Sequence, residues 1–153
     1  HTFLVGKYKV ERDADKILNL IFGNNLDLRK EIVLEEDPKV GQENKDLGRA
    51  QVIDYKSNSI EISVSAKNKA LLFLSEIYYP GWKASVNGKN VKILRSNYIF
   101  RAVPVEKGQY TVRIFYDPWS FKLGAYLATL GLAGMILMVL ASRNKDRSKP
   151  FFS

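Results

Sequence analysis

A short aromatic segment, residues 75–83 (SEIYYPGWK), carries the side chains best suited to bind a ligand in this 153-residue chain. Exposed aromatic rings can stack on a sugar ring, and neighbouring basic side chains can bind phosphate or carboxylate groups. The candidate substrate-facing residues are Tyr78, Tyr79, Trp82, Lys83, Arg95 and Arg101. The alternative interpretation is structural, with the rings in a core and Pro80-Gly81 joining two strands in a type II turn. The usual burial of large aromatic side chains favours the structural interpretation.

The sequence lacks the usual catalytic and metal-binding sets. His1 is the only histidine and there is no cysteine, so neither Ser-His-Asp chemistry nor a histidine or thiolate metal site is indicated. There is no Gly-rich phosphate loop and no GxSxG turn. The acidic run at residues 35–37 leads into a Pro-containing loop and is typical of a solvated face. We therefore predict no catalytic residue, no metal and no cofactor in this chain.

Most of the chain shows the alternating pattern of β-strands. In residues 60–66 and 110–116 apolar side chains largely alternate with polar ones, as in half-buried antiparallel strands. Further strands are predicted at residues 31–35, 51–55, 71–76, 83–86, 91–94 and 98–103. Asn87-Gly88 predicts a type I′ hairpin turn, because that turn needs positive φ at both central residues. The many short strands predict a mainly β fold, an antiparallel β-sandwich or jelly-roll-like domain.

One helix is predicted near the start of the chain, at about residues 13–22. Asp13 is the predicted N-cap, and apolar side chains then recur at helical spacing up to Phe22. Gly23-Asn24 provides a C-terminal stop. We expect this helix to lie on the face of a sheet.

An uncharged run at residues 123–141 predicts a transmembrane helix. Its 19 residues correspond to about 28 Å of helix, close to the hydrocarbon thickness of a bilayer. A buried core helix is the alternative, but Trp119, Phe121 and Tyr126 cluster at one end as an interfacial aromatic belt would. The predicted organisation is a domain at residues 1–118, a transmembrane helix with its flank at 119–142, and a basic tail at 143–153.

The distribution of basic residues predicts the orientation of this helix. The tail holds Arg143, Lys145, Arg147 and Lys149, which places the C-terminus in the cytoplasm and the β-domain outside. A net charge of +8 also invites a nucleic-acid interpretation, but no nucleic-acid-binding motif is present and we predict no such partner. The start at His1 shows no signal peptide, so we expect either a removed leader or sequence upstream.

A resemblance to a known family rests on residues 78–124, which read YYPGWKASVNGKNVKILRSNYIFRAVPVEKGQYTVRIFYDPWSFKLG. This stretch resembles the C-terminal region of the YfhO family of bacterial integral membrane proteins. That region has a YPGW-x-A segment, a two-residue turn with Gly, a stretch similar to RANYAFRGVPVPAG, a Tyr-x-Pro strand end and a last membrane helix. Residues 27–36, DLRKEIVLEE, resemble its helix-to-strand passage.

The resemblance implies a function that the residues alone do not. YfhO-type proteins are polytopic, resemble GT-C glycosyltransferases, and are linked to glycosylating envelope polymers such as lipoteichoic acid from a lipid-phosphate-linked sugar. Their catalytic acidic residue lies near the first membrane helices, so none is carried over to this chain. The implied partners are membrane lipid, upstream transmembrane helices of the parent chain, and an envelope glycan or polyprenyl-phosphate sugar. The alternative is a non-catalytic, membrane-anchored glycan-binding or structural β-sandwich module.

Overall fold

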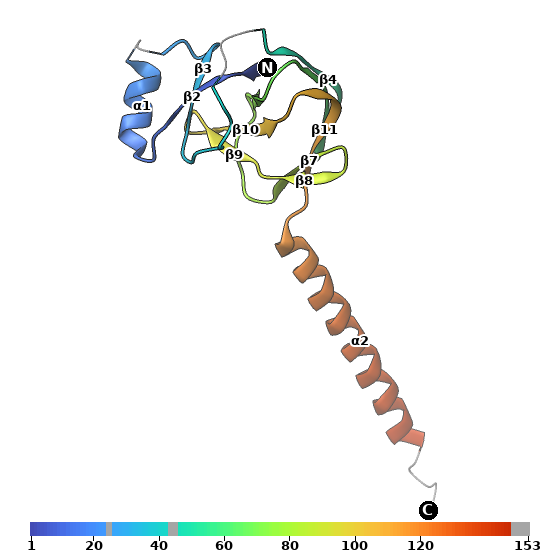
Figure 1. Ribbon diagram of the computed structural model, residues 1–153. Coiled ribbons are helices and arrows are strands. Elements are labelled where there is room, and N and C mark those ends of the chain that lie inside the picture. Colours follow the sequence, from blue (N-terminus) through green and yellow to red (C-terminus); the bar gives the residue numbers. More distant parts are fainter. Residues whose placement is uncertain (24–25, 43–45, 148–153) are drawn as a thin grey trace, which may run out of the picture. The chain divides into compact units, whose positions relative to one another are not determined.

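The computed structural model describes residues 1–23, 26–42 and 46–147, with side chains described up to residue 140. The chain divides into two compact units, His1–Asp117 and Pro118–Ser153. Figure 1 shows the strands and the short helix α1 in the first unit, and the long helix α2 in the second. Asn24 of the predicted helix stop, residues 43–45 of the loop after the acidic run, and residues 148–153 of the tail lie outside the described ranges.

The first unit contains two β-sheets. The six-stranded sheet has the order β1-β6-β10-β9-β3-β2, and the five-stranded sheet has the order β4-β5-β11-β7-β8. The strands of the first are β1 (Thr2–Val5), β6 (Ala70–Leu74), β10 (Phe100–Val105), β9 (Leu94–Ser96), β3 (Glu31–Leu34) and β2 (Lys7–Val10). Those of the second are β4 (Gly48–Lys56), β5 (Ser59–Ala66), β11 (Gly108–Tyr116), β7 (Trp82–Val86) and β8 (Lys89–Val91).

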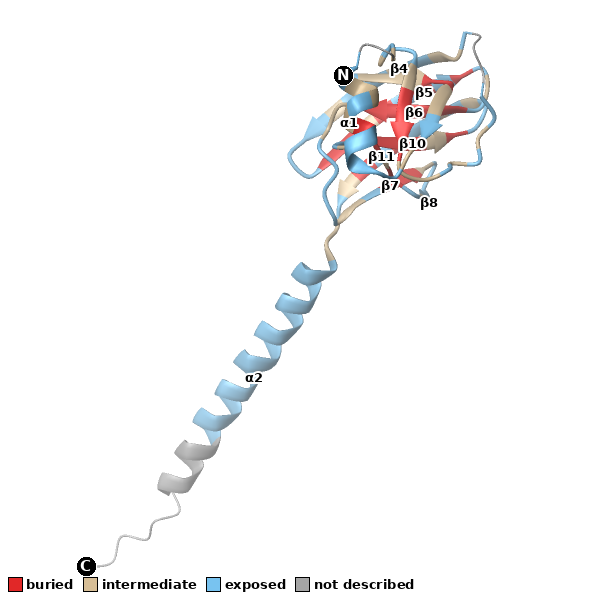
Figure 2. Ribbon diagram, turned by 90° about the vertical axis from the view of Figure 1, so that its left-hand side faces the viewer, coloured by how far each residue is buried: buried red, intermediate tan, exposed pale blue. Residues whose placement is uncertain are grey.

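The main hydrophobic core lies between the two sheets. Inward residues of β5 and β11, such as Ile62 and Val112, are fully buried against inward residues of β6 and β10, such as Leu72 and Val103. Along β5 the buried positions alternate with more exposed ones, as the period of a half-buried strand requires. Figure 2 shows the buried residues concentrated in the layered strands. The predicted mainly β two-sheet fold is therefore confirmed.

The helix α1 (Ala14–Phe22) lies between β2 and β3 in sequence. Asp13 is its N-cap and accepts a hydrogen bond from the Lys16 backbone N–H at 3.0 Å. Strands β2 and β3 are parallel, unlike the other pairs among the described strands, and α1 belongs to the crossover that a parallel pair needs. Figures 1 and 2 show α1 over one outer face of the sandwich, where its Ile17 is buried.

Several strand predictions differ from the structure in detail. The predicted strand at residues 91–94 is two strands, because β8 belongs to one sheet and β9 to the other, and the chain crosses between them at residues 92–93. The strand predicted at 98–103 begins at Phe100, since Asn97 and Tyr98 have φ of 45° and 70°. It continues through Pro104, which is tolerated because β9 pairs with β10 only up to Ala102. Strands β1 and β2, of four residues each, were not predicted.

The second unit is the helix α2 (Trp119–Arg147). Residues Trp119–Leu140 form a segment of 22 residues that is long and apolar enough to cross a membrane, and none of it is buried against protein. At 1.5 Å per residue this segment is about 33 Å long, which matches a bilayer core.

Candidate functional site

The aromatic segment forms a turn that joins the two sheets. Residues 75–81 lead from β6 of the six-stranded sheet to β7 of the five-stranded sheet. The turn is held by backbone hydrogen bonds from Tyr78 N to Ile99 O at 2.7 Å and from Asp117 N to Gly81 O at 2.8 Å. Gly81 has φ of 101°, as expected for the third position of a type II turn that follows Pro80. The Pro80-Gly81 turn and these hydrogen bonds therefore hold the side chains of the segment in place where the two sheets are connected.

A surface pocket of about 290 Å³ lies beside this turn, over the hairpin of β7 and β8. Three of the residues predicted to face a substrate, Tyr78, Trp82 and Lys83, line it together. The other lining residues are Ala84, Asn90, Val91, Lys92 and Ile93. The pocket has the size of the smallest ligand sites in proteins, so it has room for about one sugar ring.

Two lysines give this pocket a basic rim. Lys83 Nζ lies 2.6 Å from a carboxylate oxygen of Asp117, and Lys92 Nζ lies 2.5 Å from one of Glu36. Both lysine side chains are about half or more exposed. Ion pairs this exposed contribute little to stability, so an anionic ligand can compete for the ammonium groups at low cost. The pocket therefore combines aromatic walls, one amide and two ammonium groups.

Arg101 lies behind the indole of Trp82 rather than in the pocket. Its side chain is buried, with 4% of the residue exposed, and its guanidinium carbon lies 4.2 Å from the centre of the Trp82 ring. Its Nε and Nη2 donate to the Ile77 carbonyl oxygen at 2.9 and 2.5 Å. Among the described residues its Nη1 has no hydrogen-bond partner. Burial lowers the pKa of Arg101, and the nearby Glu76 carboxylate opposes that shift.

The indole of Trp82 is thus part of the packing of the domain as well as of the pocket. It is half-buried against the main core, and its ring centre lies 5.5 Å from that of Tyr116 at the end of β11. One face of the ring is occupied by Arg101, so only the remaining surface is available to a ligand. This arrangement holds the pocket wall in place from within the sandwich.

The remaining two candidates are not in the pocket. Tyr79 is 60% exposed, and its ring centre lies 6.5 Å from that of Tyr116. Arg95 lies on β9, where its Nε donates to the Tyr98 carbonyl oxygen and lies 3.3 Å from a Glu35 carboxylate oxygen. The structure therefore brings together three of the six candidates, places Arg101 behind them, and places Tyr79 and Arg95 elsewhere.

Sequence reasoning missed five of the residues that line the pocket, two of them polar, and a second cavity. Asn90 and Lys92 enter the pocket because the Asn87-Gly88 turn folds β8 back onto β7, with φ of 48° and 80° as a type I′ turn requires. That turn was the signal that could have indicated them. The second cavity, of about 690 Å³, is lined by Phe3, Phe73 and Phe100 from three strands and by Arg29 and Asn97, among others. Its rings come from distant parts of the chain, so no local pattern marks it.

Within the described residues, no group of three or more His, Cys, Asp or Glu side chains is placed to hold a metal ion. The pocket beside the turn offers aromatic surface and cations, and the residues that line it include no paired acid and base. A nucleophile with a neighbouring base is likewise not found among the residues that line the pocket.

Comparison with known proteins connects this fold to a family. Residues 13–128 match the family model described as bacterial membrane protein YfhO. A curated relative, the uncharacterized protein YfhO of Bacillus subtilis (strain 168), is 27% identical over 97 residues. The match covers 63% of this chain and 11% of the relative, so the chain corresponds to a small part of that protein. No solved structure matches the chain. Because the family match covers most of the chain, including the turn, the pocket and the start of α2, the chain belongs to the YfhO family of bacterial membrane proteins.

Proposed function

We propose that this chain is the C-terminal accessory portion of a polytopic membrane protein that glycosylates cell-envelope polymers, such as lipoteichoic acid, from a lipid-phosphate-linked sugar. Family membership, the small share of the relative that the chain covers, and the apolar helix α2 support this placement. In this proposal the chain binds the sugar donor, and the chemistry belongs to other parts of the parent protein.

The pocket beside Trp82 carries the proposal. The Tyr78 and Trp82 side chains offer aromatic surface to a sugar ring, and the Asn90 amide can bond its hydroxyl groups. The Lys83 and Lys92 ammonium groups are the partners for a phosphate. A polyprenyl-phosphate sugar combines these groups, and its lipid tail would remain in the bilayer that α2 is suited to span.

A binding titration of the full chain in lipid nanodiscs tests this proposal. The Trp119→Phe variant serves as the background, so that Trp82 is the remaining tryptophan. Fluorescence is then followed during titration with a hexose 1-phosphate and with the free hexose. We expect a saturable response to the phosphorylated sugar and a weaker one to the free sugar. No response to either compound would contradict the proposed site.

A matched pair of lysine variants tests the role of charge. Lys83→Gln removes one charge-assisted hydrogen bond, worth about 1.5–3 kcal/mol, so the affinity for hexose 1-phosphate should fall about tenfold or more. Lys69→Gln removes another exposed, ion-paired lysine that does not line the pocket and should leave the affinity unchanged. Equal losses in the two variants would show that only the general surface charge attracts the ligand.

The proposal places the β-domain outside the cell and the C-terminus in the cytoplasm. The four basic residues after the apolar segment support this orientation. The chain has no cysteine, so single cysteines at Lys107 and Ser142 can be labelled selectively. In intact cells a membrane-impermeant maleimide should react at position 107 and not at 142. The reverse pattern would place the domain in the cytoplasm.

A purely structural or glycan-binding module without a link to catalysis is the second candidate. It is favoured by the packing of Trp82, whose ring contacts Arg101 and Tyr116 within the domain. A structural module predicts no fluorescence response to any envelope glycan or sugar phosphate. A glycan-binding module predicts a response to the polymer itself and none to the phosphorylated donor.

A further inference from the structure

The exposed hydrophobic side chains of the β-domain are unevenly distributed. Ten large hydrophobic side chains are exposed in the described part of His1–Asp117, and six of them belong to segments that meet at the end where β11 finishes. We call this set the aromatic end, and its members are Tyr55, Ile77, Tyr78, Tyr79, Ile99 and Tyr116. Four of the six are tyrosines, which combine an apolar ring with a hydroxyl group.

Contacts within the domain show that these residues are neighbours although they come from four segments. Tyr78 N donates to Ile99 O at 2.7 Å, and the Tyr55 hydroxyl donates to a Glu76 carboxylate oxygen at 3.1 Å. The ring centres of Tyr79 and Tyr116 are 6.5 Å apart. The aromatic end is therefore one continuous surface. Each of its six side chains is exposed.

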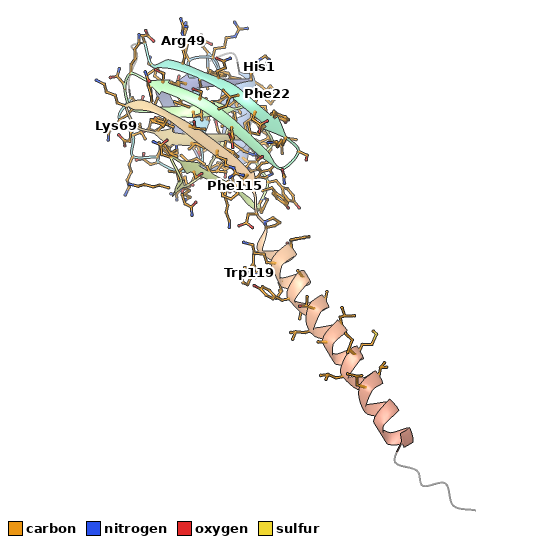
Figure 3. The ribbon with its side chains drawn as sticks, turned by 90° about the vertical axis from the view of Figure 1, so that its right-hand side faces the viewer. His1, Phe22, Arg49, Lys69, Phe115 and Trp119 are labelled. Atoms are coloured by element: carbon orange, nitrogen blue, oxygen red, sulfur yellow. The ribbon has the colours of Figure 1, made fainter. Side chains whose placement is uncertain are left out.

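The opposite end of the same sandwich is polar. It is formed by the start of β4, the turn between β5 and β6, and the turn before β11, since Gly48, Ala66 and Gly108 are paired across these strands. The exposed residues there include Arg49, Lys67, Lys69, Glu106 and Lys107. Figure 3 shows Arg49 and Phe115 at opposite ends of the five-stranded sheet. Single exposed hydrophobic residues are common on protein surfaces, but they would not gather at one end of the domain and leave the other end polar.

The aromatic end is also the end from which the chain enters the apolar helix. Only Asp117 and Pro118 separate Tyr116 from Trp119, the first residue of α2. The length of this connection keeps Tyr116 and Trp119 within about 10 Å of each other, whatever the angle between the two units. Trp119 and Phe121 are themselves exposed aromatic residues. Tyrosine and tryptophan are enriched where proteins meet the headgroup layer of a bilayer.

We propose that the aromatic end is a membrane-contact surface that rests in the headgroup layer of the bilayer spanned by α2. Along the chain, this surface is followed directly by Trp119 and Phe121, the exposed aromatic residues at the start of the helix. It would fix how the sandwich stands on the membrane and set the pocket beside Trp82 at the depth of lipid headgroups. The proposal does not require that this pocket bind a sugar.

Nitroxide labels on single cysteines test this contact in the full chain, which has no cysteine of its own. The labels are placed at Ile77, Tyr79 and Ile99, and the chain is reconstituted in nanodiscs of phosphatidylethanolamine and phosphatidylglycerol. Lys69 is the matched control, because its side chain is 59% exposed and Tyr79 is 60% exposed. A label at Leu130 in α2 gives the value for a lipid environment.

The measured quantity is the ratio of collision rates with oxygen, which dissolves in lipid, and with a water-soluble nickel chelate. We expect the three labels to give a ratio shifted from the Lys69 value toward the Leu130 value. Ratios equal to that of Lys69 would overturn the proposal. A fall of both collision rates together would show that protein, rather than lipid, covers this surface, and would also overturn it. Sugar phosphate plays no part, so the result is independent of the proposed binding function.

Discussion

Truncation of Trp82 to alanine tests how far the indole serves the packing of the domain. The side chain is half-buried against the inter-sheet core, covers the Arg101 guanidinium at 4.2 Å, and contacts the Tyr116 ring at 5.5 Å between centres. Removing it uncovers the end of the core and leaves Arg101 without its aromatic partner.

The expected cost follows from these contacts. A half-buried indole loses about 100–150 Å² of buried surface, which corresponds to about 2.5–4 kcal/mol at about 25 cal/mol per Å². Loss of the cation–π contact adds about 1 kcal/mol, and renewed hydration of the uncovered Arg101 offsets about the same amount. The free energy of unfolding should therefore fall by about 3 kcal/mol, at the low end of the range for a fully buried aromatic residue.

Denaturant unfolding of the full chain in non-ionic micelles measures this cost, with the far-ultraviolet circular dichroism of the sheets as the signal. Phe22→Ala is the matched control, because Phe22 is 78% exposed and its truncation should change the free energy of unfolding by less than about 0.5 kcal/mol. An equally small change for Trp82→Ala, accompanied by loss of hexose 1-phosphate binding, would refute the packing argument and assign Trp82 to the ligand alone.

Five further substitutions, at four positions, probe the sandwich. In denaturant titrations Arg101→Met should change the free energy of unfolding by less than about 1 kcal/mol, because removing a buried charge offsets the lost hydrogen bonds. Arg101→Ala should lower it by about 2–3 kcal/mol, because the smaller side chain leaves a cavity. In thermal melts Gly48→Ala should lower the free energy of unfolding by about 3 kcal/mol or more, because its Cβ would lie 1.9 Å from Ser65 O. Gly88→Ala should lower it by about 1 kcal/mol, because the φ of 80° is unfavourable for alanine but the added Cβ meets no atom. Burial raises the pKa of the Tyr110 hydroxyl to about 12. The stability that the neutral hydroxyl contributes should therefore be intact below pH values near 10 and be lost as the pH rises toward 12. Over this range the denaturant midpoint should fall less in Tyr110→Phe than in the unsubstituted chain.

Local patterns were sufficient for much of the fold. The alternation in residues 60–66 identified β5 because one face of that strand is buried and the other is solvated. Asp13 marked the start of α1 through its capping hydrogen bond, and Asn87-Gly88 marked a hairpin through its positive φ angles. Each of these signals is local, since a short stretch of chain contains both the residue and the physical reason for its conformation.

The rest depended on contacts between distant segments. The parallel pairing of β2 and β3 follows from a crossover that no short period records. A correct prediction of the pocket would have required Lys92, which comes from the far side of a hairpin. It would also have required Arg101 to be placed in the interior. Arginine is so rarely buried that a sequence pattern favours the surface for it, and only the structure shows the Trp82 ring and the Ile77 carbonyl that compensate its burial.

The position of Arg101 links the core of the sandwich to both proposed surfaces. Its guanidinium stacks on Trp82, which forms a wall of the pocket, and bonds the carbonyl of Ile77, which lies on the aromatic end. A methionine at position 101 would preserve most of the packing against the indole but would release the Ile77 carbonyl. The mobility of a nitroxide label at position 77 should then increase while the domain stays folded, because the turn would lose the hydrogen bonds from the Arg101 side chain to the Ile77 carbonyl. Unchanged mobility in that variant would show that the backbone hydrogen bonds of Tyr78 and Asp117 alone hold the turn in place.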